Sequence, residues 1–474
     1  MGSGNMVSMN DYVNFGDGFG VASALDVAEL NKALTSGAYA QASGVAGQVN
    51  GAAVQVESLE NSLKVLTYSD EHVKFWKKIA KVPAYSTVEE YNQLISYGSD
   101  NTGFVPEGIL PEEEDSEYRR QASFVKFLGT TRSVTHPMTL VRSAHGDVIA
   151  LENQNGILWI MKKAEDALFW GNSKLAPAGQ EGFQFDGLDQ LIHKDNVIDL
   201  KGRELRPEDI NDAAQMILDN YGVASDLYMP YDVLSVFSQE YFPKERIIMP
   251  TTSGGYQAGV VVNKFQTQGG EVAFQPDIFL RKTVPMPTSA IGKEPPTAPG
   301  NLAAAVDTGQ TGDFGKTGAG TYTYYVTAAS RKGESTPCTV KVDVALTSGD
   351  LDKAIKLTIS NSASMISPPD YFKVYRTEVN GDKAYHIMDV PAASVAAGGQ
   401  TIVYDVNYRI PNTYTAFMGE FTEDVICFKQ LAPMMKMDLA IVAPRYSWMI
   451  LLYGVPQLYA PKKWMRFVNI KAKL

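Results

Sequence analysis

The sequence predicts a mixed α+β fold that carries an internal all-β module. Three observations lead to this prediction. Two β-prone arms around a polar tip, followed by one long helical pattern, occupy residues 85–172. Helix and strand patterns then alternate over residues 175–281. Beyond residue 299, short β-rich runs follow one another at the spacing of a β-sandwich.

The first part of the chain, residues 1–57, predicts an extended arm. It is rich in Gly, Ala and Ser, holds one lysine and no arginine, and has one weak helical patch at residues 23–34. Because such a composition buries little apolar surface, we expect the arm to become ordered only on a partner.

Residues 85–134 predict two strands around an acidic tip. The arms are residues 85–97 and 122–134, and the tip, residues 101–120, carries six acids and two arginines. A mobile loop is the simple interpretation, but connections of this length usually bind something. The adjacent carboxylates of residues 112–115 suit calcium, yet they lack the spacing of a dedicated calcium loop. A solvated face, or one that meets a basic patch on another chain, fits better.

A long helix should follow this hairpin. Asp147 is a candidate N-cap, apolar residues recur at helical spacing, and Gly171 is a candidate C-terminal stop. The helix would span about 23 residues, or about 35 Å. Since Trp159 and Trp170 add apolar groups on further faces, we expect neighbouring elements to cover it on several sides.

Residues 175–281 predict an α+β unit. Pro207 should begin a helix whose apolar face runs from Ile210 to Tyr221, and Gly222 should end it. A short strand at residues 226–229 and a second helix, from Pro230 to residue 241, complete the pattern.

Five prolines in residues 285–299 predict a stiff linker, after which the short β runs begin. About 110 residues is the size of one immunoglobulin-like sandwich. Asn380-Gly381 is a candidate hairpin turn. Mixed apolar strands resume at residue 416, so the module should be an insertion. Its expected strands are residues 301–306, 321–330, 339–346, 354–360, 371–378, 385–390 and 400–406.

Composition limits the function classes. A net charge of −11 and a pI near 5.1 argue against a protein that grips nucleic acid, although residues 461–474 are basic without an acid. The two cysteines, Cys338 and Cys427, fit no metal or disulfide framework, and a reducing cytoplasm is the expected compartment. The apolar run at residues 448–453 is too short to span a membrane and predicts a buried strand.

Motifs for catalysis or cofactor binding are weak. The five histidines are scattered, and none belongs to a helical metal pair. Residues 309–317 end in Gly-Lys-Thr, but Gln310 stands where a phosphate-binding loop requires glycine. We therefore expect no cofactor, no metal and no catalytic residue.

The order of these parts resembles the major capsid proteins with the Hong Kong 97 fold. In that layout an N-terminal arm, a long hairpin loop, a spine helix and a mixed α+β unit precede returning strands. The resemblance covers residues 58–474 and is closest to the Twort-like group of large contractile-tailed phages. The similar strings are FWKKIAKVPAYSTV at 75–88, FWGNS at 169–173, FDGL at 185–188, YG at 221–222, YMP at 228–230 and APKKW at 460–464.

This resemblance implies a structural virion protein, not an enzyme. It implies a major capsid protein that self-assembles into the pentamers and hexamers of an icosahedral phage head, enclosing double-stranded DNA without sequence-specific binding. Portal, scaffold and a maturation protease would be assembly partners in the host cytoplasm, and no membrane is involved. The sandwich would be an immunoglobulin or fibronectin type III module outside the shell, open to a decoration protein or host surface glycan.

The implied parts are an N-terminal arm (1–57), an extended loop and spine helix forming a peripheral domain (58–174), the first part of an axial domain (175–297), the inserted module (298–412) and the return strands (413–474). Glu57 is the candidate site of maturation cleavage. The candidate inter-subunit contacts are the charged residues of the tip and of the C-terminal segment: Glu107, Glu112, Glu113, Glu114, Asp115, Arg119, Arg120, Lys462, Lys463 and Arg466.

Two other classes stay open. A tail or baseplate protein with an adhesive module would be favoured if the first 280 residues were β only. An enzyme with an appended binding module would need a cleft with converging titratable groups.

Overall fold

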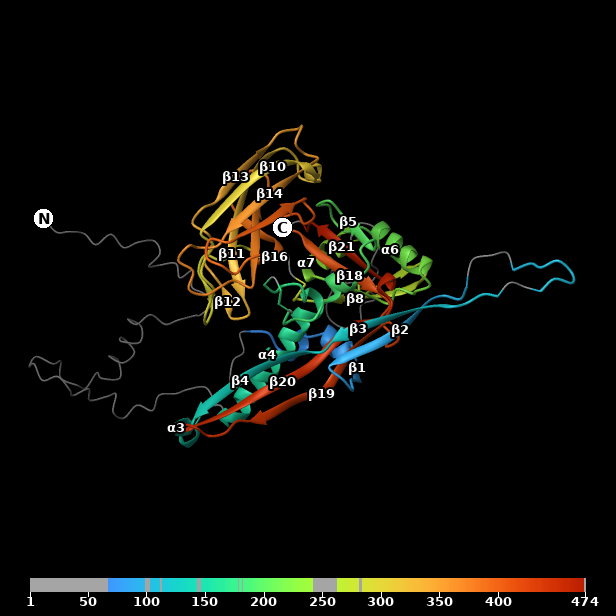
Figure 1. The fold of residues 1–474 in the computed structure, drawn as a ribbon. Coiled ribbons are helices and arrows are strands. Elements are labelled where there is room, and N and C mark those ends of the chain that lie inside the picture. The colour runs from blue at the N-terminus through green and yellow to red at the C-terminus, as the bar shows by residue number, and fades with distance from the viewer. Residues whose placement is uncertain are drawn as a thin grey trace, which may run out of the picture. The chain divides into compact units, whose positions relative to one another are not determined.

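The computed structural model describes residues 67–98, 103–110, 113–141, 143, 146–177, 179–180, 182–241, 262–280 and 284–472. Nearly all of these residues belong to one compact unit, residues 65–142 and 147–474. This unit is mixed α+β, as predicted, and Figure 1 shows its elements. The predicted arm of residues 1–57 and the cleavage candidate Glu57 lie outside the described residues.

A six-stranded sheet forms the first core. Its middle strands alternate between two apolar clusters, since Tyr228 and Phe417 face one while Leu227 and Met418 face the other. Helices α6 (Pro207–Asp219) and α7 (Tyr231–Tyr241) pack on the second cluster. The strand order is β5 (Val197–Asp199), β21 (Trp464–Ile470), β18 (Tyr414–Gly419), β6 (Asp226–Met229), β8 (Gly270–Pro276) and β7 (Lys264–Thr267).

A four-stranded sheet carries the long helix α4 (Val148–Trp170). The Asp147 carboxylate accepts the N–H of Ile149 at 3.0 Å, and Gly171 caps the other end, as predicted. Gly156 allows the close approach, because a Cβ there would lie 2.6 Å from Ile450 Cδ1. The strand order is β1 (Ala80–Pro83), β19 (Ile426–Asp438), β20 (Arg445–Leu458) and β4 (Lys126–Thr135).

Short helices flank these sheets: η2 (Asp70–His72), α2 (Phe75–Lys78), α3 (His136–Leu140), α5 (Leu188–Leu191) and η4 (Pro461–Lys463). The predicted buried strand at residues 448–453 lies within β20. It contributes Trp448, Ile450 and Leu452 to the cluster under α4.

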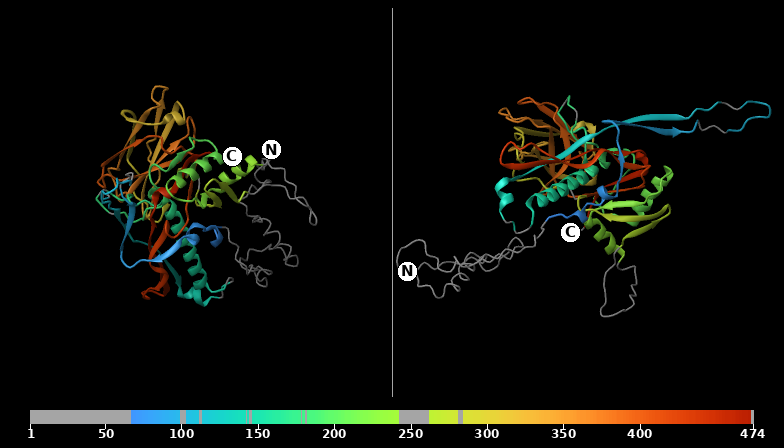
Figure 2. Two further views of the ribbon diagram at one scale, coloured as in Figure 1. Left: turned by 90° about the vertical axis from the view of Figure 1, so that its right-hand side faces the viewer. Right: turned by 90° about the horizontal axis from the view of Figure 1, so that it is seen from below.

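The hairpin differs from its prediction. Strand β2 (Val88–Ser96) pairs with β3 (Glu117–Phe124), so the tip ends before Glu117 and both tip arginines belong to a strand. The expected return arm, residues 122–134, is split at the buried Val125. Beyond Val125 the chain becomes β4, which pairs with β20 instead of β2. Figures 1 and 2 show the paired arms leaving the sheets.

The late β-rich runs form two facing sheets around their own apolar cluster, and we call residues 291–405 the β unit. All seven predicted strands occur. One sheet consists of β10 (Asn301–Thr311), β14 (Lys353–Ser360) and β17 (Gln400–Asp405). The other consists of β16 (Ala384–Pro391), β15 (Tyr371–Thr377), β11 (Gly320–Ser330), β12 (Gly333–Glu334), β9 (Ile291–Gly292) and β13 (Val342–Leu346).

The β unit is inserted in the sequence between strands of one sheet. Strand β8 precedes it and β18 follows it, and both pair with β6. The predicted stiff linker is wrong in part, because β9 pairs with β12 and Pro285 forms a bridge with Tyr385. This segment therefore runs along the β unit as part of its sheet.

One turn corrects the sequence interpretation, and another agrees with it. Helix α6 ends at Asp219, and Tyr221, expected on its apolar face, is 93% exposed with φ of 59°. In the turn after β15, Gly381 N–H donates to the Glu378 carbonyl at 2.9 Å. Asn380 has positive φ, and this turn joins the antiparallel strands β15 and β16 as predicted, within a connection of six residues.

Candidate functional site

The hairpin exposes large apolar side chains, which makes it the candidate interaction surface. Tyr85 and Tyr97 on the first arm are 90% and 86% exposed, and Phe104 and Leu110 at the tip are 92% and 89% exposed. A hairpin alone is marginally stable in water, and exposed apolar patches mark sites of protein interaction. The charges of the tip therefore surround apolar groups that sequence reasoning did not single out.

The root of the hairpin is fixed to the chain's own sheet. The Tyr91 ring packs edge-on against the Tyr459 ring with centroids 4.9 Å apart. Gln93 Nε2 donates to the Tyr459 carbonyl at 2.6 Å. The Tyr459 hydroxyl in turn donates to Gln457 Oε1 at 3.0 Å and lies 3.1 Å from Cys427 Sγ. Burial raises the pKa of the Cys427 thiol, which keeps it protonated and unreactive.

The acidic tip residues lie at the surface in the part of the tip that the structure describes. Glu107, Glu113, Glu114 and Asp115 are exposed, and Glu112 lies outside the described residues. On β3, Arg119 is exposed, whereas Arg120 forms an ion pair with Glu90 across the hairpin. The tip is thus a charged surface with apolar residues within it.

The structure corrects the interpretation of Arg466. Its side chain is buried, and Nη1 donates to the Asp189 carbonyl at 2.5 Å and to Asp189 Oδ1 at 2.7 Å. Nη2 donates to the Tyr408 hydroxyl at 2.7 Å. Because these bonds lie within one chain and exclude solvent, Arg466 is not available to a tip from another subunit.

The other two basic candidates lie nearer the surface. Lys463 Nζ pairs with Glu420 Oε2 at 3.0 Å, and Lys462 is exposed. Of the three C-terminal candidates, Lys462 therefore presents its charge to solvent most fully.

Charged side chains join the β unit, and the segment that leaves it, to strand β5 and helix α5. Arg409 Nη2 donates to Asp189 Oδ2 at 2.8 Å, and its guanidinium lies 5.1 Å from the centre of the Trp170 ring. Lys316 Nζ pairs with Asp199 Oδ2 at 2.5 Å. Burial acts to raise the pKa of Asp189, but Arg409 and Arg466 together hold it below its ordinary value. The sequence pattern gave no signal for these long-range pairs.

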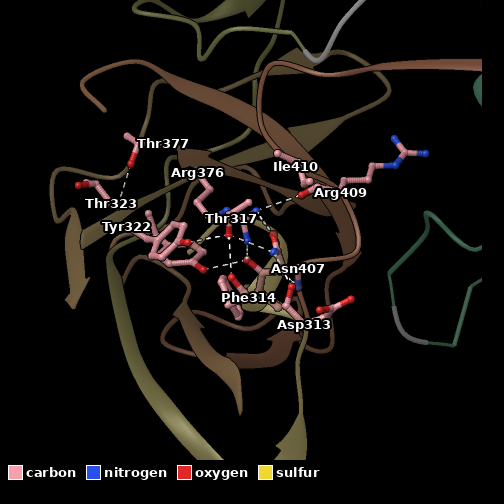
Figure 3. Close-up of polar contacts among 12 residues, drawn as sticks. Asp313, Phe314, Thr317, Tyr322, Thr323, Arg376, Thr377, Asn407, Arg409 and Ile410 are labelled. Carbon is pink, nitrogen blue, oxygen red and sulfur yellow. Dashed lines mark hydrogen bonds and ion pairs between the residues drawn. The ribbon is translucent and has the colours of Figure 1, made fainter. Parts of the chain in front are cut away.

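A buried polar network closes the end of the β unit, as Figure 3 shows. Arg376 is 0% exposed; Nη1 donates to Asp405 Oδ2 at 2.5 Å and Nη2 to Asn407 Oδ1 at 2.5 Å. Asn407 Nδ2 donates to the Asp313 carbonyl at 2.8 Å. Burial acts to lower the pKa of Arg376, but Asp405 and Tyr324 raise it above its ordinary value. Arg376 therefore keeps its charge inside the unit.

This network continues into the chain that leaves the β unit. Arg376 Nη2 also donates to the Arg409 carbonyl at 3.1 Å, and the Arg409 side chain reaches Asp189. A chain of polar contacts thus connects the interior of the β unit with Arg466 on β21.

A cavity of about 690 Å³ lies beside these contacts. Its lining includes Trp170, Tyr408 and His386. Several charged groups there pair with each other, since Asp189 binds Arg409 and Arg466, and His386 Nε2 lies 2.9 Å from Asp389 Oδ1. This is a packing arrangement of ion pairs and gives no nucleophile with an adjacent base.

Two searches of the described residues gave no candidate. No group of three or more His, Cys, Asp or Glu side chains there is arranged to hold a metal ion. No helix in that part of the chain is long and apolar enough to cross a membrane.

Comparisons with known proteins give a consistent result. The family profile of the SU10 major capsid protein matches residues 106–330. The major capsid protein of Staphylococcus phage S25-3 is 29% identical over 435 residues, covering 90% of this chain and 91% of the relative. A protein of Enterococcus phage phiEF24C, whose description also names a major capsid protein, is 30% identical over 431 residues with the same coverage.

Solved structures show weaker similarity. The capsid protein of a native GTA particle aligns with a TM-score of 0.46 at 9% identity, covering 91% of this chain and 100% of that one. The capsid protein of Myoviridae phage XM1 aligns with a TM-score of 0.42 at 8% identity, covering 87% and 97%. The sequence relationship is the stronger of the two findings.

Proposed function

The chain belongs to the family of phage major capsid proteins, a family of structural virion proteins, and we propose that its exposed hairpin joins subunits into an icosahedral head. In this proposal the fold is of the Hong Kong 97 type, and copies form pentamers and hexamers around double-stranded DNA. Repeated head-to-tail contacts between identical chains close into rings, and such rings tile a shell.

The exposed apolar residues of the hairpin are the observation that carries the proposal. Tyr97, Phe104 and Leu110 are exposed in the connection beyond the paired strands β2 and β3, whereas the root is bound at Tyr91 and Gln93. Obligate interfaces bury more than roughly 2,000 Å² and are rich in aromatic groups. A hairpin fixed at its root and apolar at its tip is suited to lie over a neighbouring subunit.

Charge would then set the register of this contact. The acids Glu107, Glu112, Glu113, Glu114 and Asp115 would meet the basic Lys462 and Lys463 of another copy, and Arg119 and Arg120 would meet acidic groups there. Exposed pairs of this kind add little affinity individually but oppose wrong registers. Arg466 is left out of this proposal because of its buried contacts with Asp189.

A pair of double variants tests the hairpin's role. Phe104→Ser with Leu110→Ser removes two exposed apolar groups from the tip, and Ile366→Ser with Val395→Ser does the same on the β unit. We expect both proteins to fold with stability within about 0.5 kcal/mol of the parent. Electron microscopy should show shells for the β-unit variant and none for the tip variant. Normal shells from the tip variant would contradict the proposal.

We assign the remaining parts as follows. Residues 1–57 are the N-terminal arm, 58–174 the peripheral part, 175–297 and 413–474 the axial part and returning strands, and 298–412 the inserted module. The facing sheets of the β unit and their shared core favour an immunoglobulin or fibronectin type III type of module. On the outside of the shell it would receive a decoration protein or a host surface glycan.

Assembly would also involve portal, scaffold and a maturation protease that cuts after Glu57. The intact mass of chains from mature particles tests the cleavage, because retention of Met1 or Gly2 would contradict it. A β-only first part would have favoured a tail or baseplate role, and helices α4, α6 and α7 remove that support.

A further inference from the structure

Two buried carboxyl groups meet where three segments of the chain join. Glu165 lies on the inner side of α4, and Asp277 follows strand β8. Both are 0% exposed, and each acts on the pKa of the other, so the two side chains are neighbours. The third segment is α2, which leads through β1 into the first arm of the hairpin. An acid pair at this junction needs a physical explanation, because buried like charges repel strongly.

Glu165 caps helix α2 from outside that helix. Its Oε1 accepts the N–H groups of Lys74 at 2.9 Å and Phe75 at 2.7 Å, and its Oε2 accepts that of Trp76 at 2.5 Å. Lys74, the N-cap residue, makes no side-chain capping bond of its own. The Glu165 carboxylate on α4 thus accepts the N–H groups that the first turn of α2 leaves unpaired.

Asp277 has one oxygen without a donor. Its Oδ1 accepts the Phe279 N–H at 2.7 Å, while Oδ2 is buried with no hydrogen-bond donor among the described residues. Two ionised carboxylates are both acceptors and cannot bond to each other. A proton on one of them supplies the missing donor and removes one of the two like charges.

We propose that Glu165 and Asp277 share one proton in the folded chain, forming a proton-dependent clasp that holds α2 and the start of the hairpin arm against α4. With one proton the pair carries a single negative charge, which the α2 N–H groups and nearby lysines balance. Without it the pair carries two charges in a site closed to water, and the clasp opens.

The surrounding charges fit this assignment. Burial raises the pKa of Asp277, while Lys74 lowers it and Asp166 raises it. Burial lowers the pKa of Lys81, and the charge of Glu165 raises it. Lys81 Nζ is committed to the Trp76 carbonyl at 2.6 Å. Tyr228 on β6 also faces the pair, and burial raises the pKa of its hydroxyl. Asp226 lies near Tyr228 and pairs with Lys78 at 2.5 Å.

The titration of the pair gives the direction of the effect. Burial, with Asp277 beside it, raises the pKa of Glu165 from 4.5 to about 8, and burial also raises that of Asp277. The folded chain therefore binds a proton that the unfolded chain has lost. Its stabilising effect is complete below about pH 4.5 and is lost as the pH rises through about 8. Each pH unit in this window lowers the folding equilibrium constant by up to about tenfold.

Asp277→Asn is the sharpest test. The asparagine Oδ1 can still accept the Phe279 N–H, and its Nδ2 can donate to Glu165, so each contact survives without a shared proton. Asp438→Asn is the control, because it removes a carboxylate that is 80% exposed. Denaturant unfolding of the full-length chain is measured between about pH 6 and about pH 9, with light scattering confirming a constant assembly state.

We expect the parent and the Asp438→Asn variant to lose stability in parallel as the pH rises. The folding equilibrium constant of the Asp277→Asn variant should fall about tenfold less per pH unit than that of the parent, up to about pH 8. An Asp277→Asn variant with the parent's pH slope would overturn the proposal.

A measurement on the parent chain keeps the proposal testable if that variant does not fold. Infrared spectroscopy detects the carbonyl stretch of a protonated carboxyl group, which we expect at neutral pH and expect to vanish above about pH 9. Over the same range, hydrogen exchange at Lys74, Phe75 and Trp76 should accelerate beyond its intrinsic pH dependence. Absence of a protonated carboxyl at neutral pH would refute the clasp.

Discussion

The hairpin and the β unit both leave a sheet and return to one, yet they differ in what they bury. The β unit packs residues such as Tyr322, Tyr324 and Phe372 into its own cluster at 1% exposure or less. The hairpin has no such cluster in the described residues, and its Phe104 and Leu110 face solvent. An excursion that buries its own apolar groups can be stable alone, whereas one that exposes them depends on other chains.

Isolated fragments give the largest contrast. We expect residues 284–411 to unfold cooperatively, because they include the whole β unit, the Pro285 bridge and the Arg409 carbonyl that binds Arg376. A peptide of residues 84–125 should show no cooperative transition. Circular dichroism and proton NMR measure both. An unfolded β-unit fragment would show that it needs Asp189 and Asp199 of the remaining chain.

A single substitution should separate the interior of the β unit from its surface. Arg376→Met leaves Asp405 and Asn407 buried without their partner and should cost about 3–5 kcal/mol of the unfolding free energy. Arg331→Met, an exposed position with a ring contact to Phe183, should stay within about 0.5 kcal/mol. Urea unfolding of the full-length chain checks both, and equal effects would contradict the proposed importance of the network.

Local sequence patterns predicted the elements whose partners are near in the chain. Asp147 and Gly171 set the ends of α4, and short β-rich runs predicted β6 and seven of the strands of the β unit. The prediction of one return arm at residues 122–134 was wrong at Val125, because the sequence alternation gives no sign of the break between β3 and β4. Only pairing with β20, more than 300 residues later, shows that β4 belongs to another sheet.

Charged residues were the other source of error. Arg466 lies in a basic run and was expected at the surface, but Asp189 and Tyr408 bury it. Glu165 lies in a long helix whose pattern predicts a solvated acid equally well. Both cases depend on partners from distant segments, which composition and periodicity do not identify.

The smallest effect concerns the root of the hairpin. Gln93→Ala removes the bond to the Tyr459 carbonyl and should cost about 0.5–1.5 kcal/mol. Asn92→Ala, exposed on the other face of β2, should stay within about 0.5 kcal/mol. Hydrogen exchange of the β2 amides checks the difference, and equal protection in the two variants would show that the root is held by strand pairing alone.

The central claim is that the hairpin tip contacts a neighbouring subunit. Cryo-electron microscopy of shells assembled from the full-length chain tests it most directly. The account predicts density for Phe104 and Leu110 packed against another copy, with the root still bound at Tyr459. Complete shells in which these two side chains face solvent would contradict it.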